Sequence, residues 1–172
     1  MFPAGSFTAD KPCPIDGGRR YLVKGQTNLD KTFECMANVG VAGWKSLGQA
    51  LTAAMQKSIN DPGGCNAGFL RKDALLMVTT IATNIDDPEF GSEGTPEEWA
   101  QAVIYAKGGD EKSIVIYNIG GTGCFPNDRV CRMAKMFTYN HLVHVEEPDY
   151  GPGFSEAAGL VETACAGFTP PG

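Results

Sequence analysis

The sequence has little histidine, no excess of positive charge and no long apolar segment. Two histidines occur in 172 residues, and no two cysteines have Cys-x-x-Cys spacing, so a zinc site is not expected. Lys and Arg number 14 against 20 Asp and Glu, which gives a net charge of −6 without a basic stripe for nucleic acid. No apolar run approaches the ~20 residues that cross a bilayer. These absences argue against zinc proteins, nucleic-acid-binding proteins and transmembrane proteins.

The usual motifs for catalysis and nucleotide binding are also missing. No Gly-x-Ser-x-Gly elbow follows an apolar segment, which argues against a hydrolase. The segment "NIGGTGC" (118–124) is neither a Walker loop nor Gly-x-Gly-x-x-Gly, because Pro126 stands where the third glycine is needed. We interpret it as a tight turn. A small nucleotide-binding α/β protein is the less favoured alternative, and we do not expect an enzyme.

Cysteine is the residue type that indicates the compartment. The six cysteines are spread over the whole chain, and an even number fits up to three disulfides in an oxidising, extracytoplasmic protein. The alternative is a cytosolic protein with buried free thiols. The short segment "CFPNDRVC" makes Cys124 and Cys131 the first candidates for a local disulfide. The candidates together are Cys13, Cys35, Cys65, Cys124, Cys131 and Cys165.

The start of the chain does not supply an export signal. "MFPAGSFTADKPCP" has neither the basic nor the apolar region of a signal peptide. We therefore expect either a cytosolic protein or a chain whose true N-terminus lies elsewhere.

Hydrophobic periodicity predicts alternating strands and helices. Apolar and β-branched runs predict buried strands, and spacings of three and four residues predict helices. Thr95, Pro96 and Glu98 have the pattern of a capping box with proline at the first helical position. Strands are predicted at 19–25, 73–83, 112–121 and 141–147, and helices from 28, at 44–59, 95–109, 127–137 and 151–168.

This order predicts an α/β fold. Continuous apolar strands are typical of a mainly parallel central sheet flanked by helices on both faces, as in Rossmann-like proteins. Such folds bind ligands at the carboxyl ends of the strands, which directs attention to residues 83–94 and 118–128.

Two polar segments suggest a cation site. In "NIDDPE" the carboxylates of Asp86 and Asp87 offer the hard oxygen ligands that Mg²⁺ and Ca²⁺ prefer, although a solvated turn explains this segment better when it is taken alone. In "GQTNLDKTF" (25–33), Thr27 precedes a predicted helix, where threonine or asparagine is most often an N-cap.

The phrase "GQTNLDKTF" also resembles the second metal-site motif of von Willebrand factor A domains. A long predicted helix and a buried strand ending in "IATNIDD" follow in the order of that family. The segments "TFECMANVGVAGW" and "NAGFLRKDALL" resemble a secreted bacterial, myxobacterial-type branch of it. The resemblance covers most of residues 15–165. It implies that Thr27 binds the metal ion directly or through water and that Asn84 acts through water. Asp86 and Asp87 are the candidates to compensate for the charge that Asn84 does not bring.

The departures from the family pattern predict an incomplete domain. The main Asp-x-Ser-x-Ser motif is missing, and Asn84 stands where the family has Asp. Residues 1–24 are expected to be an irregular lead-in, 25–168 the C-terminal two-thirds of the domain, and 169–172 a tail. A sheet without its central strand would expose apolar faces and edges, so we expect completion by a protein partner or by the other half of a precursor.

By resemblance, we expect an extracytoplasmic adhesion or protein–protein assembly module, oligomeric or part of an assembly. Its site for Mg²⁺ or Ca²⁺ would be degenerate or shared. The main alternative is a structural subunit of a secreted filament or surface assembly with a vestigial metal site.

Overall fold

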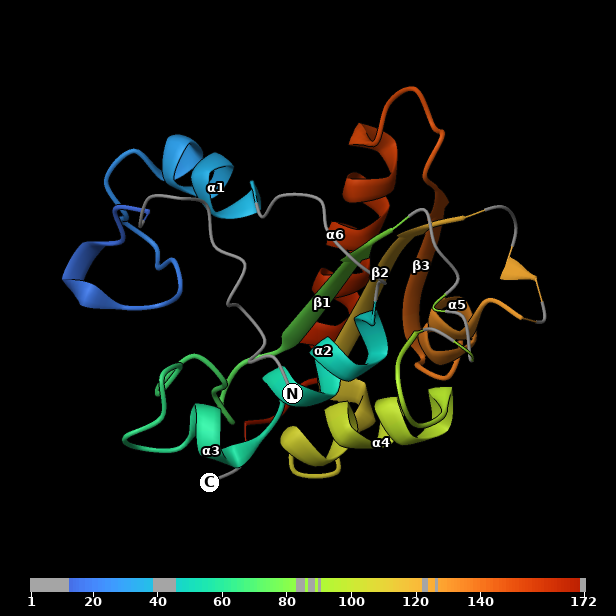
Figure 1. The fold of residues 1–172 in the computed structure, drawn as a ribbon, viewed down its shortest axis with the longest axis horizontal. Helices are drawn as coiled ribbons and strands as arrows, with labels where there is room; N and C mark the ends of the chain where they lie inside the picture. The colour runs from blue at the N-terminus through green and yellow to red at the C-terminus, as the bar shows by residue number, and fades with distance from the viewer. Residues whose placement is uncertain are drawn as a thin grey trace.

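The structure is a computed structural model that describes residues 13–38, 46–82, 86, 89, 91–121, 124–125 and 127–170. It is an α/β fold, as the sequence predicted (Figure 1). Within the described residues, no helix is long and apolar enough to cross a membrane. The elements in chain order are η1 (Asp16–Gly18), α1 (Leu29–Ala37), α2 (Leu47–Ala54), α3 (Lys57–Asn60), β1 (Leu76–Ile81), α4 (Pro96–Ala106), η2 (Glu111–Ser113), β2 (Ile114–Gly120), α5 (Arg129–Ala134), β3 (Tyr139–His144) and α6 (Gly151–Gly167).

The three strands form one parallel sheet in the order β1-β2-β3. Leu76 pairs with Ile114 at the start of β1, and Val115 pairs with Tyr139 at the start of β3. Every residue of β2 is buried, whereas buried and exposed residues alternate along β1. The middle strand is therefore covered on both faces, and β1 is covered on one.

One face of the sheet carries the larger hydrophobic core. Successive strand residues point to opposite faces, so Leu76 and Val78 of β1 share a face with Ile114 and Ile116 of β2. This face packs against α4 and α5, with α2 alongside. The helical members of the core are Trp99, Ala100, Val103, Val130, Met133 and Ala134.

The opposite face packs against α6, which lies behind the strands in Figure 1. Tyr117 and Ile119 contact the buried Ala157 of this helix. The helix approaches closely at Gly153, where a built Cβ would lie 2.6 Å from the Tyr117 hydroxyl oxygen. Contacts of α6 reach β2 and β3, so the same face of β1 remains exposed at Met77 and Ile81.

The capping box predicted for α4 is present. The Glu98 backbone N–H donates to Thr95 Oγ1 (3.2 Å), and the Thr95 backbone N–H donates to Glu98 Oε2 (2.8 Å). Pro96 occupies the first helical position, where its missing N–H costs nothing. Local sequence therefore fixes where α4 begins.

The strand predicted at 19–25 is wrong, because these residues form a bend, irregular backbone and a turn. They belong to a unit with α1 that stands apart from the sheet in Figure 1. The Cys13–Cys35 disulfide closes this unit, and the buried Gln26 bonds the Asp16 N–H and the Pro14 carbonyl through its amide. Hydrogen bonds from the Gln26 side chain therefore take the place of the backbone hydrogen bonds that a strand at 19–25 would have made with a neighbouring strand.

The helix predicted at 44–59 is divided. Only residues from 46 onward lie in the described part, and the helix ends at Ala54 and resumes as α3. Gln56 between the two has extended backbone angles, and the Asn60 side-chain amide donates to the carbonyls of Ala54 and Gln56. Asn60 therefore satisfies helix-end carbonyls that a continuous helix would bond internally.

Gly48→Ala tests the packing of α2 on α4. A Cβ at Gly48 would lie 2.2 Å from the Trp99 ring, so we expect a loss of about 2–3 kcal/mol in the free energy of unfolding. Gly159→Ala in α6 is the matched control, because its Cβ would meet nothing within 4 Å. That variant should gain about 0.5–1 kcal/mol. Urea unfolding measures both, and equal effects would contradict this packing.

Candidate functional site

Thr27 lies in the turn before α1, and its side chain is exposed. Its backbone N–H donates to Asp16 Oδ2 (2.8 Å), and its carbonyl accepts from Gln26 Nε2 (3.1 Å). The N-cap residue of α1 is Asn28, which has left-handed backbone angles and makes no side-chain cap hydrogen bond. The predicted side-chain cap is therefore wrong. The Thr27 hydroxyl makes no hydrogen bond within the described residues.

Asp86 is fully buried in the loop after β1. Its Oδ1 accepts from the Ser92 backbone N–H (2.5 Å), and its Oδ2 accepts from the Ser92 hydroxyl (2.6 Å) and the Gly48 backbone N–H (2.8 Å). The Gln49 N–H in turn donates to Ser92 Oγ (2.8 Å). Asp86 and Ser92 thus satisfy first-turn N–H groups of α2, which the helix itself cannot satisfy.

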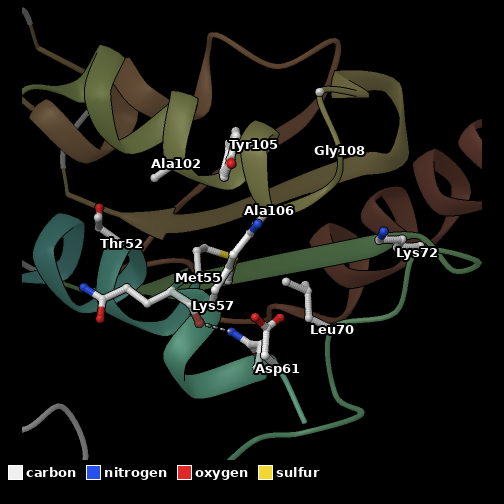
Figure 2. Close-up of a pocket in the computed structure, with 13 residues that line it drawn as sticks. Thr52, Met55, Lys57, Asp61, Leu70, Lys72, Ala102, Tyr105, Ala106 and Gly108 are labelled. Atoms are coloured by element: carbon white, nitrogen blue, oxygen red, sulfur yellow. Dashed lines mark hydrogen bonds between the residues drawn. The ribbon is translucent and has the colours of Figure 1, made fainter. Parts of the chain in front are cut away.

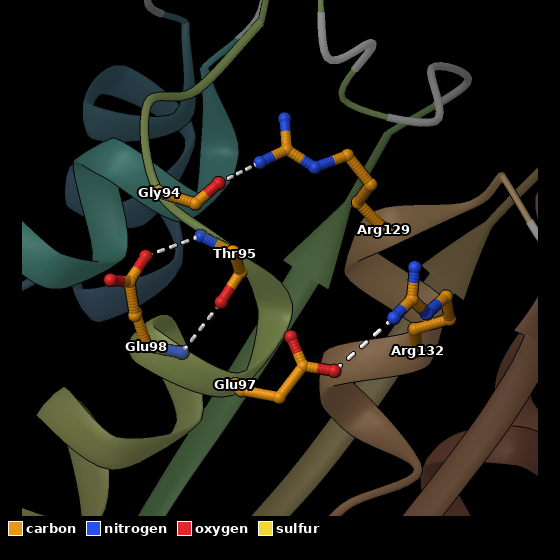
Figure 3. Close-up of polar contacts among 6 residues, drawn as sticks. All are labelled: Gly94, Thr95, Glu97, Glu98, Arg129 and Arg132. Carbon is orange, nitrogen blue, oxygen red and sulfur yellow. Dashed lines mark hydrogen bonds and ion pairs between the residues drawn. The ribbon is translucent and has the colours of Figure 1, made fainter.

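Arg129 holds the other side of the same loop. Its guanidinium donates to the carbonyls of Ser92 (2.9 Å) and Gly94 and lies 4.5 Å from the Trp99 ring centroid. Figure 3 shows Arg129 extending from the start of α5 toward Gly94, while Arg132, one turn further on, pairs with Glu97 of α4 (3.2 Å). A buried cation is stabilised here by carbonyl oxygens and an aromatic face. The loop between β1 and α4 is therefore fixed to α2 and α5.

The residues predicted to hold a cation are not seen together as one site. Thr27 is bonded to Asp16 and Gln26, and Asp86 to Gly48 and Ser92. Asn84 and Asp87 lie outside the described residues. Within the described part, no group of three or more His, Cys, Asp or Glu is placed to bind a metal ion. The site for Mg²⁺ or Ca²⁺ stays a prediction.

Two disulfides are present. Cys124–Cys131, the local pair expected from the sequence, joins the loop after β2 to α5. Cys13–Cys35 closes the unit around α1, and Cys65 and Cys165 are free and exposed. Two disulfides fit an extracellular protein.

The face of β1 that α6 leaves uncovered is an exposed apolar surface. The side chains of Met77 and Ile81 are 39% and 61% exposed, with Thr79 exposed between them. β1 is an edge of the sheet, and no described strand pairs with its outer side. We call this surface, made by Met77, Thr79 and Ile81, the β1 surface. Sequence periodicity missed it because a continuous apolar run predicts burial on both faces.

A groove of about 610 Å³ separates α2 and α3 from α4 (Figure 2). Met55 and Leu70 line it, and Lys57 Nζ lies 5.7 Å from the centroid of the Tyr105 ring. Lys72 and the glycines after α4 place the groove at the amino ends of the strands. Ligands of α/β sheets bind at the opposite end, so we assign the groove no function.

The fold and these surfaces define the class of protein as a disulfide-bonded α/β protein with a parallel sheet. Comparison with models of protein families, with curated proteins and with solved structures gave no match.

Asp86→Asn tests whether this carboxylate anchors the loop. Asparagine presents an NH₂ group to donors that now meet a carboxylate oxygen, so we expect a loss of about 3 kcal/mol. Asp30→Asn is the control, because Asp30 is exposed and should change stability by less than about 0.5 kcal/mol. Chemical unfolding with and without EDTA measures the difference. A loss that disappears in EDTA would show that Asp86 acts through an ion and not through these hydrogen bonds.

Proposed function

We propose that the chain is an extracytoplasmic adhesion or assembly module, similar to a von Willebrand factor A domain, that binds another polypeptide along β1. The observation that carries this proposal is the β1 surface. Exposing an apolar sheet face beside an unpaired strand edge to water is unfavourable in free energy, and binding a partner there removes this exposure. The partner is a polypeptide that adds a strand to the sheet. A second copy of the chain takes this place when no other partner is supplied.

The sequence of β1 lacks the features that protect edge strands. Its six residues, "LMVTTI", include no lysine, no other charge and no proline. Proteins that keep an edge free of partners commonly place such residues on it. The composition of β1 is that of a paired strand, and it favours a partner on the open side.

The backbone of β1 supports the same proposal. The Ala82 N–H donates to the Ile119 carbonyl (3.0 Å). Backbone groups alternate in direction along a strand, so Val78 and Thr80 also direct theirs toward β2. The alternate residues Met77, Thr79 and Ile81 direct theirs to the open edge. The same three residues therefore offer backbone hydrogen bonds and exposed side chains to a partner strand.

A divalent cation belongs to this proposal as a degenerate or shared site. Among Thr27, Asn84, Asp86 and Asp87, both carboxylate oxygens of Asp86 already accept hydrogen bonds from the protein, so the partner would contribute ligands. The alternative is a structural subunit with a vestigial site. It is favoured by Asp86, whose two carboxylate oxygens already accept hydrogen bonds from the protein.

The double variant Met77→Lys, Ile81→Lys tests binding along β1. Both side chains are exposed, so the protomer stays folded, while two charges oppose strand addition. We expect the unmodified chain to self-associate with rising concentration and the variant to associate about ten-fold more weakly or not at all. Sedimentation equilibrium measures this association.

Met136→Lys is the matched control, because Met136 is also 39% exposed but lies outside the sheet. It should associate like the unmodified chain. A chain that is monomeric at every concentration, or equal weakening by both sets of substitutions, would refute the proposal.

Thr27→Ala tests the cation site. The Thr27 side chain is exposed, so the substitution alone should cost less than about 0.5 kcal/mol. We expect Mg²⁺ or Ca²⁺ to raise the melting midpoint of the unmodified, self-associated protein relative to EDTA, and to raise that of Thr27→Ala less. No shift in the unmodified protein would select the structural subunit with a vestigial site.

A further inference from the structure

A second cavity lies at the carboxyl ends of β2 and β3, beside α5. Its volume is about 320 Å³, within the range of small-ligand sites. Asn118 and Gly121 line it from the end of β2, Leu142 and His144 from β3, and Lys135 from the end of α5. It is separate from the β1 surface, since Asn118 is on the middle strand and faces α5.

Asn118 is the polar group at the base of this cavity, and it is 5% exposed. Its Oδ1 accepts a hydrogen bond from the Thr80 hydroxyl (2.6 Å), which holds the side chain in place. Its Nδ2 donates to no described residue. Among the described residues, the buried side-chain polar atoms without a partner are Asn60 Oδ1 and the Tyr117 hydroxyl oxygen, so Asn118 Nδ2 is accessible from the cavity. A held amide therefore presents its two N–H groups to whatever enters.

The residue two positions along the strand keeps space open for this amide. A Cβ built on Gly120 would lie 2.7 Å from Asn118 Nδ2 and 3.5 Å from its Oδ1. Any side chain at position 120 would displace the amide or fill the space beside it. The sequence "NIG" (118–120) thus provides both the donor and the room for an acceptor.

The residues that line the walls of the cavity include charged and apolar side chains. Lys135 contributes an ammonium group, and Leu142 contributes apolar surface. Asp128 also lines the cavity, but its Oδ1 accepts the Cys131 backbone N–H (2.9 Å) as the cap of α5, and burial raises the pKa of this carboxyl. His144 Nδ1 accepts the Glu146 N–H (3.2 Å), so that nitrogen faces its own turn.

We propose that this cavity binds a carboxylate, whose oxygens accept from the Asn118 amide and pair with Lys135. The carboxylate is either a free small acid or an acidic side chain of a protein ligand. An amide donor with a lysine nearby satisfies a carboxylate better than a neutral acceptor, because charge-assisted hydrogen bonds are the stronger ones. A ligand ammonium would instead seek Asp128, whose Oδ1 is engaged by the start of α5.

Nuclear magnetic resonance of the ¹⁵N-labelled full chain tests this binding directly. Titration with acetate, against chloride at equal ionic strength, should shift the Asn118 side-chain NH₂ signals saturably. A blocked peptide with one glutamate is the second arm. Tighter binding of the peptide identifies a protein side chain as the source, and tighter binding of acetate identifies a free acid.

Two variants and their controls separate binding from folding. Asn118→Leu and Lys135→Gln should each weaken acetate binding about ten-fold or more, the latter without affecting the fold because Lys135 is exposed. Lys24→Gln and Lys31→Gln each remove an exposed lysine that does not line the cavity. Both controls should bind acetate within about two-fold of the unmodified chain.

Three results would overturn the proposal. They are shifts that chloride reproduces, shifts that do not saturate, and binding that Lys135→Gln leaves unchanged. Methylammonium binding more tightly than acetate would also overturn it, since Asp128 and not Asn118 would then be the recognising group.

Discussion

The complete burial of β2 determines how the rest of the chain is arranged. No residue of this strand is exposed, so each face of it must be covered by helices. One face is covered by α4 and α5 around Ile114 and Ile116, and the other by α6 around Tyr117. Because α6 covers mainly β2 and β3, Met77 and Ile81 on the same face of β1 remain exposed. The β1 surface is thus a direct consequence of how the middle strand is buried.

The loop between β1 and α4 makes the larger core possible. Asp86 bonds to the start of α2, and Arg129 bonds to the same loop from α5 while stacking on Trp99. These two buried charged side chains connect three helices at the carboxyl end of the sheet. Asp86 thus has a structural role in the acidic loop after β1. In a vestigial cation site the Asp86 carboxylate would keep only these hydrogen bonds, whereas in a shared site it would also bind the ion.

Much of the fold could be predicted from the sequence. Apolar runs identified β1 and β2, helical spacing identified α4 and α6, and the Thr95 capping box marked the start of α4. The short spacing of Cys124 and Cys131 identified their disulfide. These features are local, so a single stretch of sequence contains the information. The strand at 19–25 failed because Gln26 and a disulfide hold those residues from outside the stretch.

The sites were less predictable, because they depend on which residues meet in space. Arg129 and Asn118 carry no local signal, since an arginine at a helix start and an asparagine in a strand are ordinary until their neighbours are known. Asp86 was identified as a candidate ligand, but its partners Gly48 and Ser92 come from segments that only the fold brings together. The exposure of Met77 and Ile81 depends on the reach of α6, which the sequence of β1 does not contain.

Amide hydrogen exchange of β1 at low and high protein concentration tests the central claim most directly. If another polypeptide pairs with this edge, the amides of Met77, Thr79 and Ile81 become protected as concentration rises, while those of Val78 and Thr80, which face β2, stay protected throughout. Exchange at Met77, Thr79 and Ile81 that remains fast and independent of concentration, in a protein that nevertheless associates, would contradict assembly along β1.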